Sequence, residues 1–206
     1  MTTTEDDGAL ELLAPLAGTD PRELERLHSR LERAAARAGI LDVAYRTLET
    51  PVGALLLAAT DAGLVRVAFA SEDHDSVLET LAAKISPRIL LAPARLAEAA
   101  RQVDEYFAGT RTQFELPLDF RLSRGFRRDV LGHLAGIAYG RTESYAQVAE
   151  AVGSPRAVRA VGSACATNPL PVVVPCHRVV RSDGSFGGYV GGPDAKRTLL
   201  NFESAA

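Results

Sequence analysis

The amino-acid sequence predicts a mixed α/β protein with three parts. Three observations support this order: one amphipathic pattern near the N-terminus, a change to the two-residue period of strands at Val43, and a return to helical periods after Arg121. We expect a helical extension at residues 1–40, a small α/β domain with an antiparallel sheet at 41–119, and a mostly helical domain at 120–206.

The composition is that of an ordinary globular protein. Of 206 residues, 47% are hydrophobic, 24% are charged and 6% are aromatic, which excludes disordered and collagen-like chains. No apolar run approaches the roughly 18 residues that a membrane span needs, and the acidic start at Glu5, Asp6 and Asp7 is unlike a secretory leader. We therefore expect a cytoplasmic protein without a membrane partner.

The charge is distributed unevenly along the chain. Residues 1–120 carry 12 Lys+Arg against 20 Asp+Glu, a balance of −8, whereas residues 121–206 carry 11 against 6, a balance of +5. Almost all basic residues of the second part are arginines, and Lys196 is its one lysine. Because arginine suits phosphate recognition, the C-terminal part is the candidate partner for a polyanion.

The extension predicts one amphipathic helix. Asp20, followed by Pro21 and Glu23, forms a capping box with proline at the first helical position, and Gly39 ends the helix. Its apolar stripe is narrow and consists of Leu24, Leu27 and Leu31. A helix of this kind cannot bury its stripe alone, so we expect it to dock on another domain or subunit.

Strands joined by short turns are predicted for the region that begins at Val43. Their apolar positions are Tyr45, Leu48, residues 54–59, Val65, Val67 and Phe69, with turn residues at 51–53 and 61–63. Helices are expected at about 73–85 and 94–107, with an apolar segment at 89–91 between them. The proline-containing stretch 114–120 is predicted to be a linker.

Helices are predicted at about residues 126–137, 144–152 and 155–167 of the last part. Ser144 and Gln147 form a second capping box, and Gly153–Pro155 predicts a tight corner. Two short helices joined by such a corner fit a helix-turn-helix whose second helix is 156–167. Many helical pairs share this spacing, so it does not establish DNA binding without the charge distribution.

A cysteine beside a histidine follows an apolar run and a proline. Val172–Val174 is predicted to be a buried strand, and Pro175 should place Cys176 where the chain leaves the sheet. Cysteine attacks as the thiolate, and His177 and Arg178 are the local groups that could favour it. Because neighbours on an extended chain point to opposite sides, His177 would reach the sulfur through a water or a turn and not directly, and Glu203 could orient the imidazole.

Structural interpretations exist for the same residues. A buried cysteine often acts as a small hydrophobe, which is our interpretation of Cys165 within an Ala/Gly helix. The glycines near residue 190 could form a flexible hairpin, and Tyr145 could belong to the core. No metal site is expected, because His28, His74 and His133 are scattered along the chain.

Several groups of residues, taken together and in order, distinguish between these interpretations. They are Gly140, Thr142, Ser144, Tyr145 and 156–162; Asn168, Pro169, Leu170, Pro171 and 175–179; and 187–192, Lys196, Leu199, Leu200 and Glu203. This pattern resembles the O6-alkylguanine-DNA alkyltransferases, also called methylated-DNA protein-cysteine methyltransferases. The resemblance is dense over residues 126–203 and looser over 43–120. It implies a ribonuclease H-like first domain and a winged-helix-like second domain.

The resemblance implies direct reversal of DNA alkylation in one irreversible turnover. Cys176 would accept the alkyl group of O6-methylguanine, and also of O4-methylthymine, after base flipping. His177, oriented by Glu203, would take the thiol proton through a water, and Tyr145 would donate a hydrogen bond to the base. The partner would be double-stranded DNA containing O6-alkylguanine, bound by a monomer that needs no cofactor.

The remaining implied roles concern DNA and the base pocket. Arg159 would enter the duplex and fill the space of the extruded nucleotide, and an inaccessible alkyl group inside a stacked duplex requires such extrusion. The other implied DNA-binding residues are Ser144, Tyr145, Arg156 and Ala160; the hinge and pocket residues are Asn168, Pro171, Tyr189, Val190 and Gly191. Glycines at 187, 188, 191 and 192 are expected to adopt positive φ and to allow close backbone approach.

Two alternatives remain open from the sequence. The first is a sensor of alkylated bases or a DNA-binding module without chemistry of its own, although the acceptor position holds a cysteine, unlike the lesion sensors of this family. The second is a Cys-His hydrolase with many turnovers. Val190 stands where smaller or polar residues are common, which affects the range of alkyl groups accepted. The N-terminal helix has no counterpart in the minimal family pattern.

Overall fold

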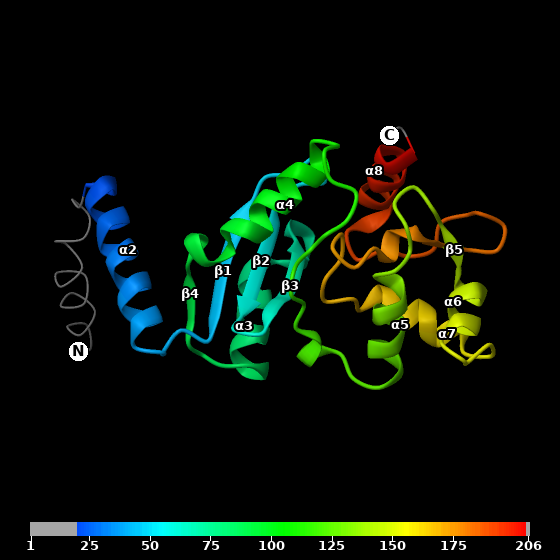
Figure 1. Ribbon diagram of the computed structural model, residues 1–206, viewed down its shortest axis with the longest axis horizontal. Helices are drawn as coiled ribbons and strands as arrows, with labels where there is room; N and C mark the ends of the chain where they lie inside the picture. The colour runs from blue at the N-terminus through cyan, green and yellow to red at the C-terminus, as the bar shows by residue number, and fades with distance from the viewer. Residues whose placement is uncertain (1–19, 205–206) are drawn as a thin grey trace, which may run out of the picture. The chain divides into compact units, whose positions relative to one another are not determined.

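The computed structural model describes residues 20–204, which separate into two compact units, one up to Leu41 and one from Asp42 onward (Figure 1). The part of the extension before residue 20 lies outside the described residues. In the first unit, helix α2 spans Pro21–Arg37. The Asp20 carboxylate accepts a hydrogen bond from the Arg22 backbone N–H at 3.0 Å, and Gly39 follows the helix with φ of 63°. The predicted helix, its cap and its stop are thus confirmed.

The second unit begins with a four-stranded sheet in the order β3-β2-β1-β4. β1 (Val43–Leu48), β2 (Leu55–Thr60) and β3 (Gly63–Phe69) form the predicted antiparallel meander. β4 (Ile89–Leu91), the short apolar segment of the sequence, joins β1 in parallel, so the sheet is mixed. The reason is connectivity: a helix separates β3 from β4, and a crossover of this length permits parallel pairing.

Two helices belong to the sheet domain. α3 spans His74–Lys84, and a 3-10 turn at Pro93–Leu96 leads into α4 at Ala97–Phe107. β2 is buried at every position because it lies in the interior of the sheet. A core cluster that includes Leu56, Val65, Val77 and Leu81 joins the sheet to α3. Removal of these apolar side chains from water is the main contribution to the free energy that stabilises the folded domain.

The segment predicted to be a linker is held against the sheet. Leu64 N–H donates to the Pro117 carbonyl at 2.8 Å, and Asp119 N–H donates to the Leu64 carbonyl at 2.8 Å, which forms a parallel bridge between Leu64 and Leu118. The buried Asp119 carboxylate accepts a hydrogen bond from the Thr60 hydroxyl at 2.6 Å. It also accepts one from the Arg121 N–H at 3.0 Å and caps the 3-10 turn Phe120–Leu122. The connection is therefore part of the folded unit.

The C-terminal part contains the predicted helix-turn-helix. α5 (Phe126–Leu134) packs against α6 (Tyr145–Ala151) and α7 (Val158–Ala166), and α6 packs against α7. The Ser144–Gln147 capping box is confirmed, since the Ser144 hydroxyl accepts from Gln147 N–H at 3.2 Å and the Gln147 side chain accepts from Ser144 N–H at 2.7 Å. α7 begins two residues later than predicted because a turn precedes it.

One prediction for this part is wrong. Val172–Val174 is not a strand but a sequence of turns, in which Val172 has φ of 70° and Val174 N–H donates to the Leu170 carbonyl. The prolines on both sides limit the backbone N–H donors that a strand would need, so the valines are buried without sheet pairing. A 3-10 turn at Cys176–Arg178 follows, then β6 (Val179–Val180), which pairs in parallel with β5 (Glu143–Ser144), and finally α8 (Gly192–Ser204).

None of the helices within residues 20–204 combines the length and the apolar character needed to cross a membrane.

We predict that Asp119→Ala lowers the free energy of unfolding by about 1–3 kcal/mol, because it leaves the buried Thr60 hydroxyl without its acceptor and removes a cap. Urea unfolding measures this loss. In a double-mutant cycle with Thr60→Val, the two losses should not add, since both remove the same hydrogen bond. Fully additive losses would contradict the assigned contact.

Candidate active site

The thiol of Cys176 lies inside the protein. Its side chain is 1% exposed and sits at the first position of the 3-10 turn after Pro175. Asn168 Nδ2 is 3.1 Å from Cys176 Sγ and 2.8 Å from the Val174 carbonyl, while its Oδ1 accepts from the Leu170 N–H at 2.9 Å. One buried amide therefore fixes the end of α7, the following turn and the sulfur together.

The surroundings of Cys176 keep the resting thiol protonated. Burial raises its pKa to about 11, although the Asn168 hydrogen bond and the charge of Lys196 act in the opposite direction. Lys196 is itself fully buried on α8, and its ammonium donates to the Val179 carbonyl at 2.6 Å. Sequence reasoning gave Lys196 no role. The signal that could have identified Lys196 is that it is the single lysine among the arginines of the C-terminal part and lies on the apolar side of the last helix.

His177 has a defined tautomer because one of its ring nitrogens faces a carboxylate. Nε2 lies 2.9 Å from Glu203 Oε1, so Nε2 carries the proton and donates it to this hydrogen bond. Nδ1 is buried and has no hydrogen-bond partner among the described residues. Burial lowers the pKa of His177 despite the opposing carboxylate. The imidazole is therefore neutral, and Nδ1 presents a lone pair as a potential proton acceptor.

The Glu203 carboxylate is 3% exposed and receives hydrogen bonds from several chain segments. Oε1 accepts from Tyr106 Oη at 2.8 Å and from Arg178 Nη2 at 2.8 Å, and Oε2 accepts from Arg178 Nε at 2.9 Å and from Gly140 N–H at 3.3 Å. Burial opposes ionisation, but the bonds from His177 and Arg178 outweigh it and lower the pKa of Glu203 to about 2. The carboxylate is thus charged.

Arg178 pairs with the Glu203 carboxylate. This pairing corrects the prediction that Arg178 could activate the thiol. Its guanidinium is bidentate on Glu203, donates to the Ile137 carbonyl and lies 5.7 Å from the centre of the Tyr139 ring. Adjacent residues of the 3-10 turn project in different directions, so the charge of Arg178 is used to pair Glu203. Tyr106, on α4 of the sheet domain, was also missed, because it precedes Glu203 by 97 residues.

Tyr145 lies at the start of α6, immediately after the Ser144 cap, and reaches the glycine-rich loop. A Cβ on Gly187 would overlap Tyr145 Oη, so only glycine permits this approach. Burial, followed by the nearby Cys165 and Cys176, raises the pKa of Tyr145. The phenol therefore keeps its proton and can donate it in a hydrogen bond.

Tyr189 and Gly191 are brought into contact with an aromatic side chain of the sheet domain. Phe69 packs edge-on against Tyr189 with 5.7 Å between ring centres, and a Cβ on Gly191 would meet the Phe69 ring at 2.6 Å. Tyr189 also lies edge-on to His177 at 6.3 Å, and its hydroxyl oxygen is buried. Of the four glycines expected at positive φ, only Gly192 adopts it, with φ of 84°. Gly187 and Gly191 instead allow the close approach of Tyr145 and Phe69, and the space beside Gly188 is open.

The predicted DNA-contacting residues lie on the surface of the helix-turn-helix. Arg156, Arg159 and Ala160 are exposed at the start of α7, and Ser144 is half-buried at the cap of α6. Pro171 is buried in the turn after Asn168. The helix-turn-helix and Cys176 are thus connected through α7 and the Asn168 turn.

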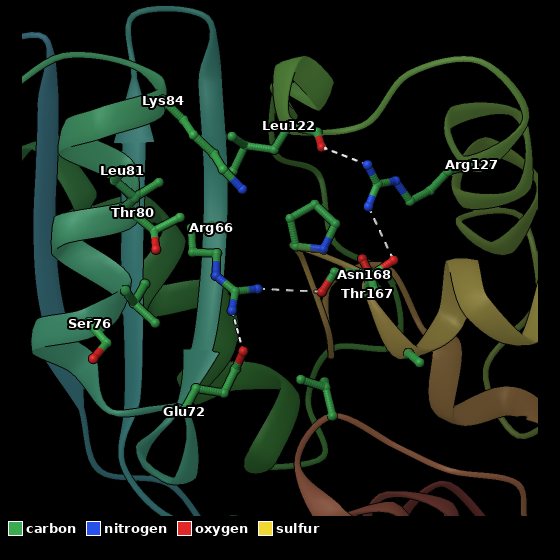
Figure 2. Close-up of a pocket in the computed structure, with 14 residues that line it drawn as sticks. Arg66, Glu72, Ser76, Thr80, Leu81, Lys84, Leu122, Arg127, Thr167 and Asn168 are labelled. Atoms are coloured by element: carbon green, nitrogen blue, oxygen red, sulfur yellow. Dashed lines mark hydrogen bonds and ion pairs between the residues drawn. The ribbon is translucent and has the colours of Figure 1, made fainter.

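A cleft lies between the sheet domain and the helical part, on the Arg66 side of Asn168 (Figure 2). Figure 2 shows the Arg66 guanidinium between the Glu72 carboxylate and the Asn168 carbonyl, which are its two partners. Arg127 bonds to Thr167 and to the Leu122 carbonyl. Val190 also lines this cleft. The contacts fix the turn that holds Asn168.

Within the described part of the chain, no group of three His, Cys, Asp or Glu residues is placed to hold a metal ion. Cys165 is buried in α7, and burial raises the pKa of its thiol to about 12, as a structural cysteine requires. Cys165 and Cys176 are both free.

Two family models match the chain over most of its length. Residues 43–120 match the ribonuclease-like domain of 6-O-methylguanine DNA methyltransferase, and residues 125–205 match its DNA binding domain. Helix α2 lies outside both matches. These matches agree with the order of an N-terminal sheet domain followed by a helical C-terminal domain.

Relatives and solved structures support the same assignment. The chain is 42% identical over 163 residues to a constitutive methylated-DNA–protein-cysteine methyltransferase of Bacillus subtilis, covering 77% of this chain and 94% of that protein. It is 40% identical over 161 residues to the enzyme of that name from Mycolicibacterium paratuberculosis, covering 78% and 92%. A crystal structure of Mycobacterium tuberculosis OGT in complex with DNA aligns with a TM-score of 0.67 at 36% identity, covering 79% of this chain and 93% of that one. The chain therefore belongs to the 6-O-methylguanine DNA methyltransferase family.

Proposed function

We propose that this chain repairs O6-alkylguanine in double-stranded DNA by moving the alkyl group to Cys176 in one irreversible step. The observation that carries the proposal is the buried thiol of Cys176, which precedes a neutral His177 whose Nε2 is held by a charged Glu203 and whose Nδ1 is free to accept a proton. This arrangement provides a nucleophile, a base and a group that orients the base, which together make up a nucleophilic site.

The chemical step transfers the alkyl group to the protein and leaves an unmodified guanine in the DNA. Cys176 Sγ attacks the alkyl carbon, the carbon–O6 bond breaks, and its electron pair passes to the guanine, which takes up one proton in place of the alkyl group. The thiol proton moves to His177 Nδ1 through a bridging water, because Nδ1 is the acceptor that the structure leaves unpartnered. Tyr145, whose raised pKa keeps it protonated, donates a hydrogen bond to the base as negative charge develops. The thioether is stable, so each molecule acts once.

Lys196 contributes to this step as a fixed positive charge. Its positive charge lowers the pKa of Cys176 and so favours the thiolate. Because the side chain is fully buried and anchored on the Val179 carbonyl, its charge needs no rearrangement during the reaction.

The burial of Cys176 dictates how the substrate must arrive. A thiol with 1% exposure cannot reach a base within a stacked duplex, so the base must leave the helix and displace the glycine-rich loop near Gly187 and Gly191. Exposed Arg159 at the start of α7 is suited to fill the vacated space, and Arg156, Ser144 and Ala160 to contact the backbone. Tyr189 and Val190 would border the base, and Asn168 and Pro171 would hold the hinge.

Further proposals concern specificity and organisation. We propose that O4-methylthymine is also accepted, since it presents an alkyl group on the same base edge, and that a monomer binds DNA through residues 120–206 while 41–119 support the site. The alternative is a sensor of alkylated bases without chemistry. The His177–Glu203 pair favours chemistry, because binding alone needs no oriented base.

We predict that incubation with duplex DNA containing O6-methylguanine adds the mass of one CH2 unit to the protein, which replaces the thiol hydrogen with a methyl group. Intact-mass spectrometry and peptide mapping should locate it on Cys176. Cys165→Ser is the matched control and should still be methylated, whereas Cys176→Ser should not. Tight lesion binding by the wild type without a mass change would establish the sensor alternative.

Glu203→Gln should destabilise the protein by about 3–5 kcal/mol at neutral pH, because it leaves Arg178 buried without its counterion. The folded pKa of Glu203 is about 2, below the ordinary 4.5. Its stabilising effect is therefore complete above about pH 4.5 and is lost as the pH falls towards 2.

Urea unfolding of wild type and Glu203→Gln between pH 2 and 7 measures this effect. The difference between the two proteins should shrink below about pH 4.5. The exposed Glu150→Gln is the control and should follow the wild type. A difference that is independent of pH would exclude the charged carboxylate as the cause.

Arg159→Ala should slow repair of duplex DNA by about tenfold or more while changing the reaction with free O6-benzylguanine by less than about twofold, because only the duplex reaction requires a flipped base. Single-turnover rates with both substrates measure the effect. Arg197, exposed on α8 and paired with Asp194, provides a control through Arg197→Ala. Equal losses on both substrates would assign Arg159 to the chemistry or to folding.

A further inference from the structure

Helix α2, which lies outside both family matches, carries a row of arginines. They are Arg22, Arg26, Arg30, Arg33 and Arg37, and all five are exposed. Their spacings of four, four, three and four residues place them on the same side of an α-helix, since such spacings return to one face. We call this row the arginine stripe.

The arginine stripe is separated from the other residues of the helix. At 3.6 residues per turn, the five positions fall within an arc of roughly 80°. The leucines lie on the opposite side: Leu24, Leu27 and Leu31, which are 49%, 48% and 54% exposed. Glu23, Glu25 and Glu32 lie outside the arginine arc. Arginine is therefore the only residue type within the arc, although Glu23 lies just beyond its edge.

This arrangement is unfavourable for the helix by itself. Like charges at spacings of three and four repel each other, and Arg22 stands near the positive end of the helix dipole. The structure shows no ion pair of these five side chains with another described residue, in contrast to arginines of the second unit such as Arg66 and Arg88. A polyanion that lies along the stripe would remove this repulsion, so the helix becomes more stable when bound.

We propose that the arginine stripe binds the phosphate backbone of duplex DNA as an accessory contact, in addition to the helix-turn-helix. From Arg22 to Arg37 the helix rises about 22 Å. This length corresponds to about six base-pair steps at 3.4 Å per phosphate along each strand. The inference rests on duplex DNA being the partner in the proposed function, and it assigns to α2 a sequence-independent share of the affinity.

Observations on the chain favour DNA over an anionic membrane. Within α2, no Trp, Tyr or Phe is present to anchor the helix at a lipid interface, and the apolar side consists of three leucines among alanines. The stripe is joined by residues 38–42 to a chain whose other end carries a DNA binding domain. Once that domain is bound, the covalent connection raises the effective concentration of the stripe arginines at the same duplex above that of a free helix.

The test compares the full chain with a variant in which all five stripe arginines are glutamine. Glutamine favours helix nearly as well as arginine, so circular dichroism should show that α2 is retained. The matched control changes Glu23, Glu25 and Glu32 to glutamine, on the other sides of the same helix. Fluorescence anisotropy with a lesion-free labelled duplex, at several salt concentrations, gives the affinity and its salt dependence.

We expect the arginine variant to bind lesion-free duplex about tenfold or more weakly at low salt, with the slope of log K against log[salt] reduced by about 2–4 because fewer counterions are released. The glutamate control should bind as well as the wild type or better. An unchanged slope in the arginine variant would overturn the proposal. So would a loss of binding to phosphatidylserine vesicles with unchanged binding to DNA.

The reaction with free O6-benzylguanine keeps this proposal separate from the proposed function. The arginine variant should react at the wild-type rate, because α2 contributes no residue to the site around Cys176. A wild-type protein that is not alkylated at all would overturn the proposed function, while the anisotropy comparison would still report on the stripe.

Discussion

The buried carboxylate of Glu203 is the interaction on which the site depends. A carboxylate removed from water is costly unless charged donors and hydrogen bonds replace its hydration. Here the donors come from Tyr106 on α4, Gly140, and His177 and Arg178 in the 3-10 turn. Satisfying one charge therefore requires four distant parts of the chain to meet, and where they meet the turn that carries Cys176 is fixed. Catalytic orientation and folding of the C-terminal part depend on the same contacts.

The reactive thiol is protected as a consequence of this packing. Burial raises the pKa of Cys176 to about 11, so the resting sulfur is a protonated and poorly accessible group. In the proposed function the nucleophile is used only once, so such protection is an advantage, because a chance reaction with a small electrophile would consume the thiol. The proposed mechanism leaves proton removal to a neutral imidazole, and the positive charge of Lys196 supports the thiolate once it forms. The proposed selectivity for a flipped base then follows from burial as much as from recognition.

Arginine side chains have different surroundings in the two units. In the second unit, arginines such as Arg66, Arg127 and Arg178 are bound to carboxylates or carbonyls and hold the fold together around Asn168 and Glu203. In α2 the arginines stand on an exposed face. The paired arginines of the second unit fix the positions of the groups that they bind. The exposed arginines of α2 produce a long-range attraction for anions, and salt screens this attraction. A chain with a formal net charge of −3 can thus carry a locally positive face on α2.

The sequence by itself determined the elements and the reacting residues. Capping boxes at Asp20 and Ser144 and the period of the strands are local signals, and local signals depend on neighbours in the chain. The resemblance identified Cys176, His177 and Glu203 as site residues. In the structure, His177 bonds to Glu203, and Cys176 precedes His177 in the same 3-10 turn. Only the tertiary structure decided that Val172–Val174 turns instead of pairing as a strand, that β4 is parallel, and that residues 114–120 are anchored. It alone showed Tyr106, Phe69 and Lys196 at the site, and the high pKa of the thiol. These properties arise from burial and from contacts between residues far apart in sequence, and no local pattern encodes them.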